Sequence, residues 1–180
     1  MLAPKKIDKV FLLFPPVRLY KETMKLVFPP LGVSYIASVI RNEVNVQIMD
    51  AVAEGFYNEM ELDEDFIVYG SSYKEILARI EEFKPEILGI TCLFSSVFPI
   101  VREICKMVKS LDPNIITITG GTYPTFCAEE LLQKEPALDM IVLGEGENTM
   151  LEIIRALRQG QGLGNIDGLA FREDGKIRIN

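Results

Sequence analysis

The chain has 180 residues, 48% of them apolar and 25% charged, which is typical of one folded domain and argues against disorder. The formal net charge of −7, without a Lys/Arg-rich stripe, argues against binding to nucleic acid or to an anionic membrane surface. No apolar run reaches the roughly 18 residues of a membrane span, and Met1–Lys6 is not followed by the apolar region of a signal peptide, so a cytoplasmic protein is expected.

The first part of the chain predicts two strands and a helix. Val10–Phe14 is a short apolar run, as in a strand covered on both faces. Helical spacing of apolar residues, with proline at the start, predicts a helix over about 30–42. Alternation over Val44–Asp50 predicts a second strand. Ala51–Gly70 is predicted to be an irregular excursion with a short extra strand, and its acidic run Glu59–Asp65 is read as a solvated loop.

The middle of the chain predicts a helix, a strand and a further helix. Ser72 and Glu75 form the pattern of a capping box, which opens a helix that Pro85 stops. Ile87–Thr91 is predicted to be the third strand, and Pro99 to begin the next helix. The buried stripe of that helix is expected to contain Ile100, Ile104, Met107 and Leu111.

The last part predicts two more strand–helix units and a hairpin. A strand over 115–119 precedes a helix over 125–134, and a strand over 140–143 precedes a helix over 148–159. After Gly164 the pattern changes, and an Asp-Gly turn between two short strands predicts a β-hairpin.

Five strands that alternate with helices predict an α/β fold with a parallel sheet, helices on both faces and right-handed crossovers. We expect the flavodoxin-like (Rossmann-like) five-stranded order 2-1-3-4-5. Residues 1–164 are predicted to form this domain. Residues 165–180, the C-terminal β-hairpin, are predicted to be a linker toward a further domain.

The chain contains no histidine, which excludes Ser-His-Asp and Cys-His catalysis and most catalytic zinc sites within it. The three cysteines, Cys92, Cys105 and Cys127, have the spacing of neither a disulfide framework nor a CxxC metal clip. No catalytic or metal-ligating residue is therefore predicted.

Ligands of open parallel sheets bind beyond the carboxyl ends of the strands. Four unusual loops are predicted at that edge, and their prolines, glycines and helix N-termini allow close approach of a bulky ligand. The candidate binding residues are Pro15, Pro16, Val17 and Arg18; Thr91, Cys92, Leu93, Ser95 and Ser96; Gly120, Gly121, Thr122, Tyr123 and Pro124; and Gly144, Glu145, Gly146 and Glu147. None of the loops carries a dinucleotide-binding glycine fingerprint.

An ordered set of motifs resembles the N-terminal cobalamin (vitamin B12)-binding domain of cobalamin-dependent radical SAM proteins, typified by class B methyltransferases and the anaerobic Mg-protoporphyrin monomethyl ester oxidative cyclase. The resemblance runs from about Lys9 to Asn180. The motifs are strand-Pro-Pro, Pro-Pro-Leu-Gly at Pro29–Gly32, Asp-Ala-x-x-Glu-Gly at Asp50–Gly55, Phe-Lys-Pro-x-x-x-Gly-Ile-Thr at Phe83–Thr91, Gly-Gly-x-x-Pro-Thr at Gly120–Thr125, Gly-Glu-Gly-Glu-x-Thr at Gly144–Thr149 and the hairpin at Gly168–Arg172.

This resemblance implies cobalamin bound base-off with no histidine ligand. The loop from Pro15 to Tyr20 would then face the lower side of the corrin, and the nucleotide tail would lie between the loops of the third and fourth strands. Thr91 would hydrogen-bond the tail base, Gly120 and Gly121 would give it space, and Gly144–Glu147 would flank it. The full-length protein would also hold a 4Fe-4S cluster and S-adenosylmethionine in a C-terminal radical SAM barrel.

The sequence departs from the family in two places and leaves alternatives open. Tyr123 stands where the family often has histidine, and the radical SAM Cys-x-x-x-Cys-x-x-Cys motif is absent, so the chain resembles a fragment. One alternative is a B12-type domain that has lost its cofactor and serves docking or substrate recognition. A receiver-like domain would require acidic residues after the first and third strands, and this sequence does not have them there. An independent Rossmann-type enzyme would require the glycine fingerprint, which is also absent from this sequence.

Overall fold

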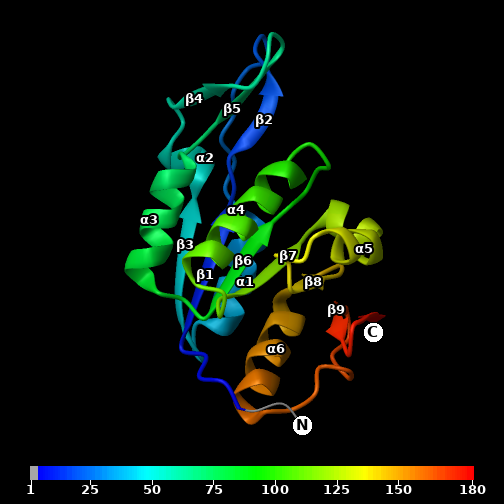
Figure 1. Ribbon diagram of the computed structural model, residues 1–180. Coiled ribbons are helices and arrows are strands. Elements are labelled where there is room, and N and C mark those ends of the chain that lie inside the picture. Colours follow the sequence, from blue (N-terminus) through cyan, green and yellow to red (C-terminus); the bar gives the residue numbers. More distant parts are fainter. Residues whose placement is uncertain (1–3) are drawn as a thin grey trace.

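The structure, a computed structural model, describes residues 4–180 and has a central sheet in the order β10-β9-β8-β7-β6-β1-β3 (Figure 1). Strand β1 lies between β3 and β6, and the four pairings β3–β1, β1–β6, β6–β7 and β7–β8 are all parallel. The predicted order 2-1-3-4-5 is therefore confirmed. The parallel strands are β3 (Asn45–Asp50), β1 (Lys9–Phe14), β6 (Ile87–Thr91), β7 (Ile116–Gly120) and β8 (Met140–Val142).

Helices cover both faces of this sheet, as predicted. One apolar cluster joins the sheet to α1 and α6, and a second joins the opposite face to α3, α4 and α5. Because both faces are covered, Val10 through Leu13 are all essentially inaccessible. Among residues 4–180, no helix has the length and apolar character needed to cross a membrane. The helices are α1 (Leu31–Ile40), α2 (Ala51–Glu54), α3 (Tyr73–Phe83), α4 (Phe98–Leu111), α5 (Thr122–Lys134) and α6 (Glu147–Gln159).

Local signals set the ends of several helices. The capping box is present, because the Glu75 backbone N–H donates to Ser72 Oγ at 3.3 Å and the Ser72 backbone N–H donates to Glu75 Oε2 at 2.7 Å. Helix α5 begins at Thr122, three residues earlier than predicted, and non-helical angles at Cys127 kink it. Leu111 was expected on the buried stripe of α4 but is 41% exposed, since it lies at the last turn.

The sheet has seven strands where five were predicted, because the C-terminal hairpin joins it. The hairpin consists of β9 (Leu169–Glu173) and β10 (Lys176–Ile179), and β9 pairs antiparallel with β8. Asp174 and Gly175 both have positive φ, as expected of a two-residue hairpin turn. Leu169, Ala170 and Phe171 are buried, so the hairpin contributes to the core of the domain.

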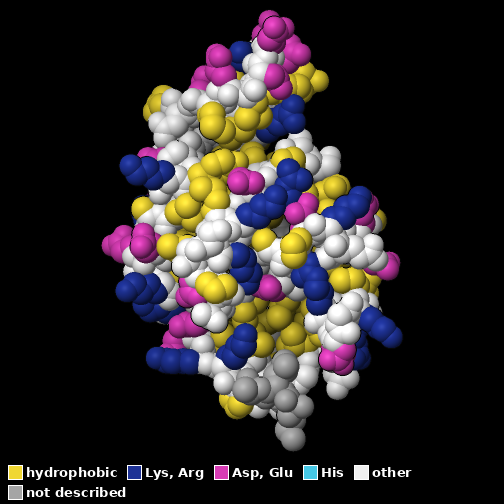
Figure 2. Space-filling view, viewed as in Figure 1, with side chains coloured by type: hydrophobic (Ala, Val, Ile, Leu, Met, Phe, Trp, Pro, Cys, Tyr) yellow, Lys and Arg dark blue, Asp and Glu magenta, His cyan; other side chains and the backbone are white. Residues whose placement is uncertain are grey.

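A second, three-stranded sheet was not predicted as such. It has the order β2-β5-β4, with β2 (Val17–Tyr20), β5 (Phe66–Tyr69) and β4 (Glu59–Glu61), and it stands beyond the carboxyl ends of the parallel strands (Figure 1). The acidic run was read as a solvated loop, but its first part forms β4. Acidic side chains gather at the far tip of this sheet (Figure 2).

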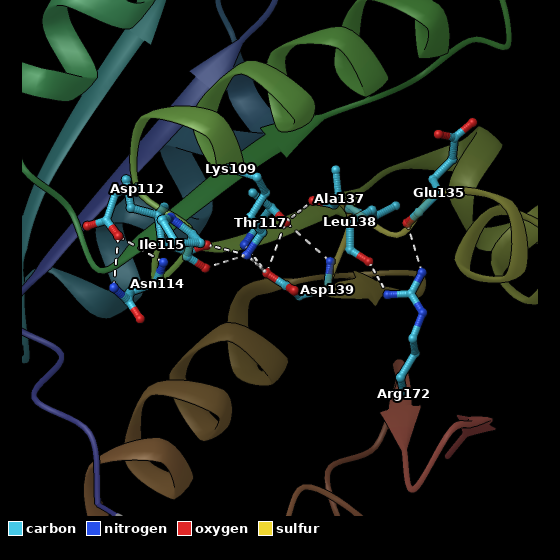
Figure 3. A network of polar contacts seen from close by, with 11 residues as sticks. Lys109, Asp112, Asn114, Ile115, Thr117, Glu135, Ala137, Leu138, Asp139 and Arg172 are labelled. Atoms are coloured by element: carbon cyan, nitrogen blue, oxygen red, sulfur yellow. Dashed lines mark hydrogen bonds and ion pairs between the residues drawn. The ribbon is translucent and has the colours of Figure 1, made fainter.

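The opposite, amino edge of the main sheet is tied together by polar contacts (Figure 3). Asp139 Oδ2 accepts hydrogen bonds from Lys109 Nζ at 2.6 Å and from the Thr117 backbone N–H at 2.8 Å. The Arg172 guanidinium of β9 donates to the backbone carbonyls of Leu132, Glu135 and Leu138, at the end of α5. These contacts join α4, β7, α5 and the hairpin on the side away from the predicted site.

Candidate functional site

A cavity of about 400 Å³ opens at the carboxyl edge of the parallel strands, between the sheet and the helices α1 and α6. This volume lies within the range of roughly 300–1,000 Å³ common for small-molecule sites. Its lining comes from β1, β6, β7 and β8, from α1, α6 and the start of α5, and from the loops that follow β6, β7 and β8. The cavity therefore lies where ligands of doubly wound sheets bind.

Glycines on two neighbouring strands form the floor of the cavity, because they have no side chain to fill it. Gly89 is paired with both Leu12 and Ile118, and Gly120 is paired with Thr91 and Val142. Because strand side chains alternate, Gly89, Thr91 and Gly120 belong to the same face of the sheet, the one covered by α1 and α6. A Cβ atom on Gly89 would lie 2.8 Å from Leu12 Cδ2, so no larger residue fits there without movement.

The deeper walls of the cavity are apolar. Leu12, Val33, Ile118, Val142 and Met150 line it and are each at most 4% exposed. Such walls favour a flat apolar group, because burying apolar surface is favourable and burying an unpaired polar group is not.

Two glycine loops meet at the mouth of the cavity. Gly121 has a φ of 116°, and a Cβ there would lie 2.6 Å from the Cys92 carbonyl oxygen, so glycine is required for this close approach. Thr125 joins the two loops, since its hydroxyl donates to the Gly121 carbonyl at 2.8 Å and accepts from the Gly144 backbone N–H at 3.1 Å. Thr125 therefore fixes the spacing of the loops after β7 and β8.

Replacing Thr125 with valine keeps the shape of the side chain but removes both hydrogen bonds. We expect the free energy of unfolding to fall by about 1–2 kcal/mol and any ligand of the cavity to bind several-fold more weakly, because the two loops lose their fixed spacing. Thermal denaturation and ligand titration of Thr125→Val measure these effects. Thr125→Ser keeps the hydroxyl and should restore both values; equal behaviour of the two variants would contradict this role.

Half of the predicted site residues line the cavity. They are Thr91, Leu93, Gly120, Gly121, Thr122, Gly144, Glu145, Gly146 and Glu147. They come from three of the four loops proposed from the sequence. The structure thus brings together the loops after β6, β7 and β8 around this one cavity.

The other predicted residues lie outside the cavity. Cys92 and Tyr123 belong to the apolar cluster on the opposite face of the sheet, where the Tyr123 ring packs 5.6 Å from that of Phe98. Pro124 is buried in the first turn of α5, and Ser95 and Ser96 are exposed in the loop before α4. Cys92 faces away because it directly follows Thr91, and neighbouring strand residues point to opposite faces.

The loop after β1 also stays outside the cavity but lies at the same edge of the sheet. Pro15 and Pro16 are buried, and Val17 and Arg18 begin β2 of the small sheet. The Arg18 guanidinium lies 3.9 Å from the centre of the Phe66 ring and 3.8 Å from Asp63 Oδ2. Its Nε atom is buried and has no hydrogen-bond partner among residues 4–180.

Burial raises the pKa of the Cys92 and Cys105 thiols to about 12, so both stay neutral at ordinary pH. Only a thiolate reacts readily with alkylating agents, and an unfolded cysteine has a pKa of about 8.5. At pH 8 we therefore expect iodoacetamide to modify the partly exposed Cys127 of the folded chain. Mass spectrometry should find Cys92 and Cys105 modified only after denaturant is added; modification of either in the folded chain would contradict this assignment.

The sequence analysis missed the cavity residues that lie within regular elements. These include Gly89 on β6, Gly32, Val33 and Ile36 on α1, and Met150 on α6. The glycine inside an otherwise apolar strand was the available signal, because such a glycine often marks a close approach of another group. Nothing in the periodicity of α1 or α6 separates a cavity wall from ordinary core packing.

The fold is flavodoxin-like, and its cavity lies at the carboxyl edge of the sheet, where ligands of such folds bind. Residues 17–154 match the family model described as the B12 binding domain, which covers more than half of the chain. The chain belongs to the B12-binding domain family.

Comparison with known proteins confirms the resemblance to cobalamin-dependent radical SAM proteins. An uncharacterized methyltransferase of Pyrococcus horikoshii is 33% identical over 96% of this chain, and the alignment covers 34% of that relative. The anaerobic magnesium-protoporphyrin IX monomethyl ester cyclase of Synechocystis is 39% identical over 57% of the chain and 21% of its own length. The chain thus spans about a third or less of these relatives.

Among solved structures, the cobalamin-dependent S-adenosylmethionine radical enzyme OxsB, with aqua-cobalamin and S-adenosylmethionine bound, superposes with a TM-score of 0.76. The match covers 97% of this chain and 22% of OxsB at 20% identity. At that identity the likeness establishes the shared fold.

Proposed function

We propose that this chain binds cobalamin base-off, with the nucleotide tail in the cavity between the sheet and helices α1 and α6. The observation that carries the proposal is the hollow left by Gly89 and Gly120 on one sheet face, enclosed by apolar side chains. A flat bicyclic base fits an apolar slot of this kind. Membership of the B12-binding domain family supports cobalamin as the occupant.

The residues at the mouth also suit a corrinoid. Exposed apolar side chains gather in segments at this edge, including Phe28, Leu31, Leu93, Phe94 and Phe126, each at least 43% exposed. Such a rim suits a large ring that is mostly apolar. Glu145 and Glu147 are acceptors placed at the mouth, where they would bind the amide N–H groups on the edge of a corrin.

Two features support the base-off form. The chain has no histidine, so it offers no imidazole to cobalt, and a tail base held in the cavity is withdrawn from the metal. We place the Pro15–Tyr20 segment on the lower side of the corrin, because it follows β1 at the same edge of the sheet (Figure 1). When bound, cobalamin supplies a cobalt centre able to take up and release a methyl group.

We further propose that the chain is part of a larger radical SAM protein. The relatives it matches are about three times its length, which supports a C-terminal barrel with a 4Fe-4S cluster and S-adenosylmethionine. In this proposal residues 165–180 lead toward the barrel, and β9 and β10 also extend the sheet. The reaction of the full-length protein would be methyl transfer or related radical chemistry.

A titration with hydroxocobalamin, followed by gel filtration and a visible spectrum, tests the proposed function. We expect the corrinoid to co-elute with the chain and to show a base-off spectrum. A spectrum with a nitrogen ligand on cobalt would contradict the base-off form. A chain that releases all of the corrinoid would instead be a docking or substrate-recognition domain that has lost the cofactor.

A further inference from the structure

We infer that the cavity selects corrinoids by the polarity of their lower base, and that it takes a benzimidazole-type base in preference to a purine. This inference rests on the proposed function, because it concerns which corrinoid the same cavity accepts. Benzimidazole and adenine are both flat bicyclic groups of similar size, so the shape of the cavity does not separate them. Their hydrogen-bonding groups do.

The inner part of the cavity offers almost no partner for a polar base. Its side chains are those of Leu12, Val33, Ile118, Val142 and Met150, all apolar and nearly inaccessible. The backbone groups of the adjoining β6 and β7 residues are used in the parallel ladder. A hydrogen-bonding group placed at this depth would stay unpaired.

Four threonines line the cavity, and one of them, Thr122, is exposed at the start of α5. Thr119 Oγ1 donates to the Ile90 carbonyl at 2.9 Å and points to the opposite face of the sheet. Thr125 is occupied by Gly121 and Gly144. Thr91 lines the cavity, and its hydroxyl makes no hydrogen bond within the described part of the chain. One free hydroxyl on the floor suits a base with one free ring nitrogen.

Adenine in the same position carries an amino group and further ring nitrogens, where dimethylbenzimidazole carries two methyl groups. The methyl groups would gain from contact with the apolar walls. The amino group and ring nitrogens would lose their water without finding partners, and one such unpaired group weakens binding by about tenfold or more. The apolar walls would therefore favour dimethylbenzimidazole over the more polar adenine.

The test measures the affinity of the purified chain for three corrinoids: hydroxocobalamin, its analogue with an adenine lower base, and cobinamide, which has no base. We expect hydroxocobalamin to bind about tenfold or more tightly than the adenine analogue. The adenine analogue should bind about as weakly as cobinamide. Equal affinity for hydroxocobalamin and the adenine analogue would overturn the inference and leave the proposed function standing. Failure to bind any of the three would overturn both.

A wall variant sharpens the test. Val142→Thr replaces a methyl group of the cavity wall with a hydroxyl at nearly constant volume, and should reduce the preference for hydroxocobalamin by about threefold or more. Val44→Thr is the matched control, because Val44 is buried in the same apolar cluster but does not line the cavity. Its preference should equal that of the original chain. A preference unchanged in Val142→Thr would overturn the role of the walls.

Discussion

Replacing Gly120 with valine is expected to weaken cobalamin binding by about a hundredfold or more while the fold is retained. A Cβ on Gly120 would lie 3.3 Å from the Val142 carbonyl oxygen and 3.5 Å from Val142 Cβ, so the strand can accept it with a small adjustment. The two further methyl groups would occupy the floor of the cavity. Because valine favours the strand conformation, stability should change little.

Far-ultraviolet circular dichroism and equilibrium titration with hydroxocobalamin measure the two effects of Gly120→Val separately. Gly162→Val is the control, since Gly162 has open space around it and lies outside the cavity. Gly120→Ala should show an intermediate loss of affinity. A folded Gly120→Val chain that binds hydroxocobalamin normally would show that the tail lies elsewhere.

Replacing Asp139 with alanine is expected to have the opposite pattern, with a large loss of stability and an unchanged affinity for cobalamin. Asp139 accepts from Lys109 Nζ and from the backbone N–H of Thr117, a fully buried residue (Figure 3). Removing the carboxylate leaves that N–H unpaired and Lys109 without its counter-charge. We expect a loss of about 3 kcal/mol and a melting temperature lower by roughly 6–12 °C.

Asp139→Asn is the matched variant for this prediction. Its amide oxygen still accepts from the Thr117 N–H, so only the charge of the pair is lost, and we expect about 1 kcal/mol of destabilisation. Thermal denaturation of both variants, with a hydroxocobalamin titration below the transition, gives the comparison. Equal destabilisation by alanine and asparagine would contradict the role of the buried hydrogen bond.

The positions of the parallel strands followed from the sequence because each strand is a short apolar run bounded by a helix signal. Their order was predicted from the flavodoxin-like arrangement typical of five βα units in a chain of this length. The small sheet could not be predicted from the sequence, because β2 has four residues and pairs with Phe66–Tyr69, far along the chain. Pairing at that distance leaves no local pattern. The hairpin was predicted, but its attachment to β8 was not, since alternation in β9 does not show which strand it pairs with.

The sequence predicted loop residues of the candidate site but not the residues that line the interior of the cavity. Thr91 and Cys92 were both proposed from one loop, yet the structure places only Thr91 at the cavity. Strand alternation separates the two side chains, but it does not say which sheet face holds the ligand. That choice depends on the gap left between the sheet and helices α1 and α6, which arises from tertiary packing.

A crystal structure of the chain with hydroxocobalamin would test the central claim most directly. We predict density for the nucleotide tail between the sheet and helices α1 and α6, with the base against Gly89 and Gly120 and no nitrogen ligand below cobalt. A tail bound on the face covered by α3 and α4, or a base that remains coordinated to cobalt outside the cavity, would contradict the account.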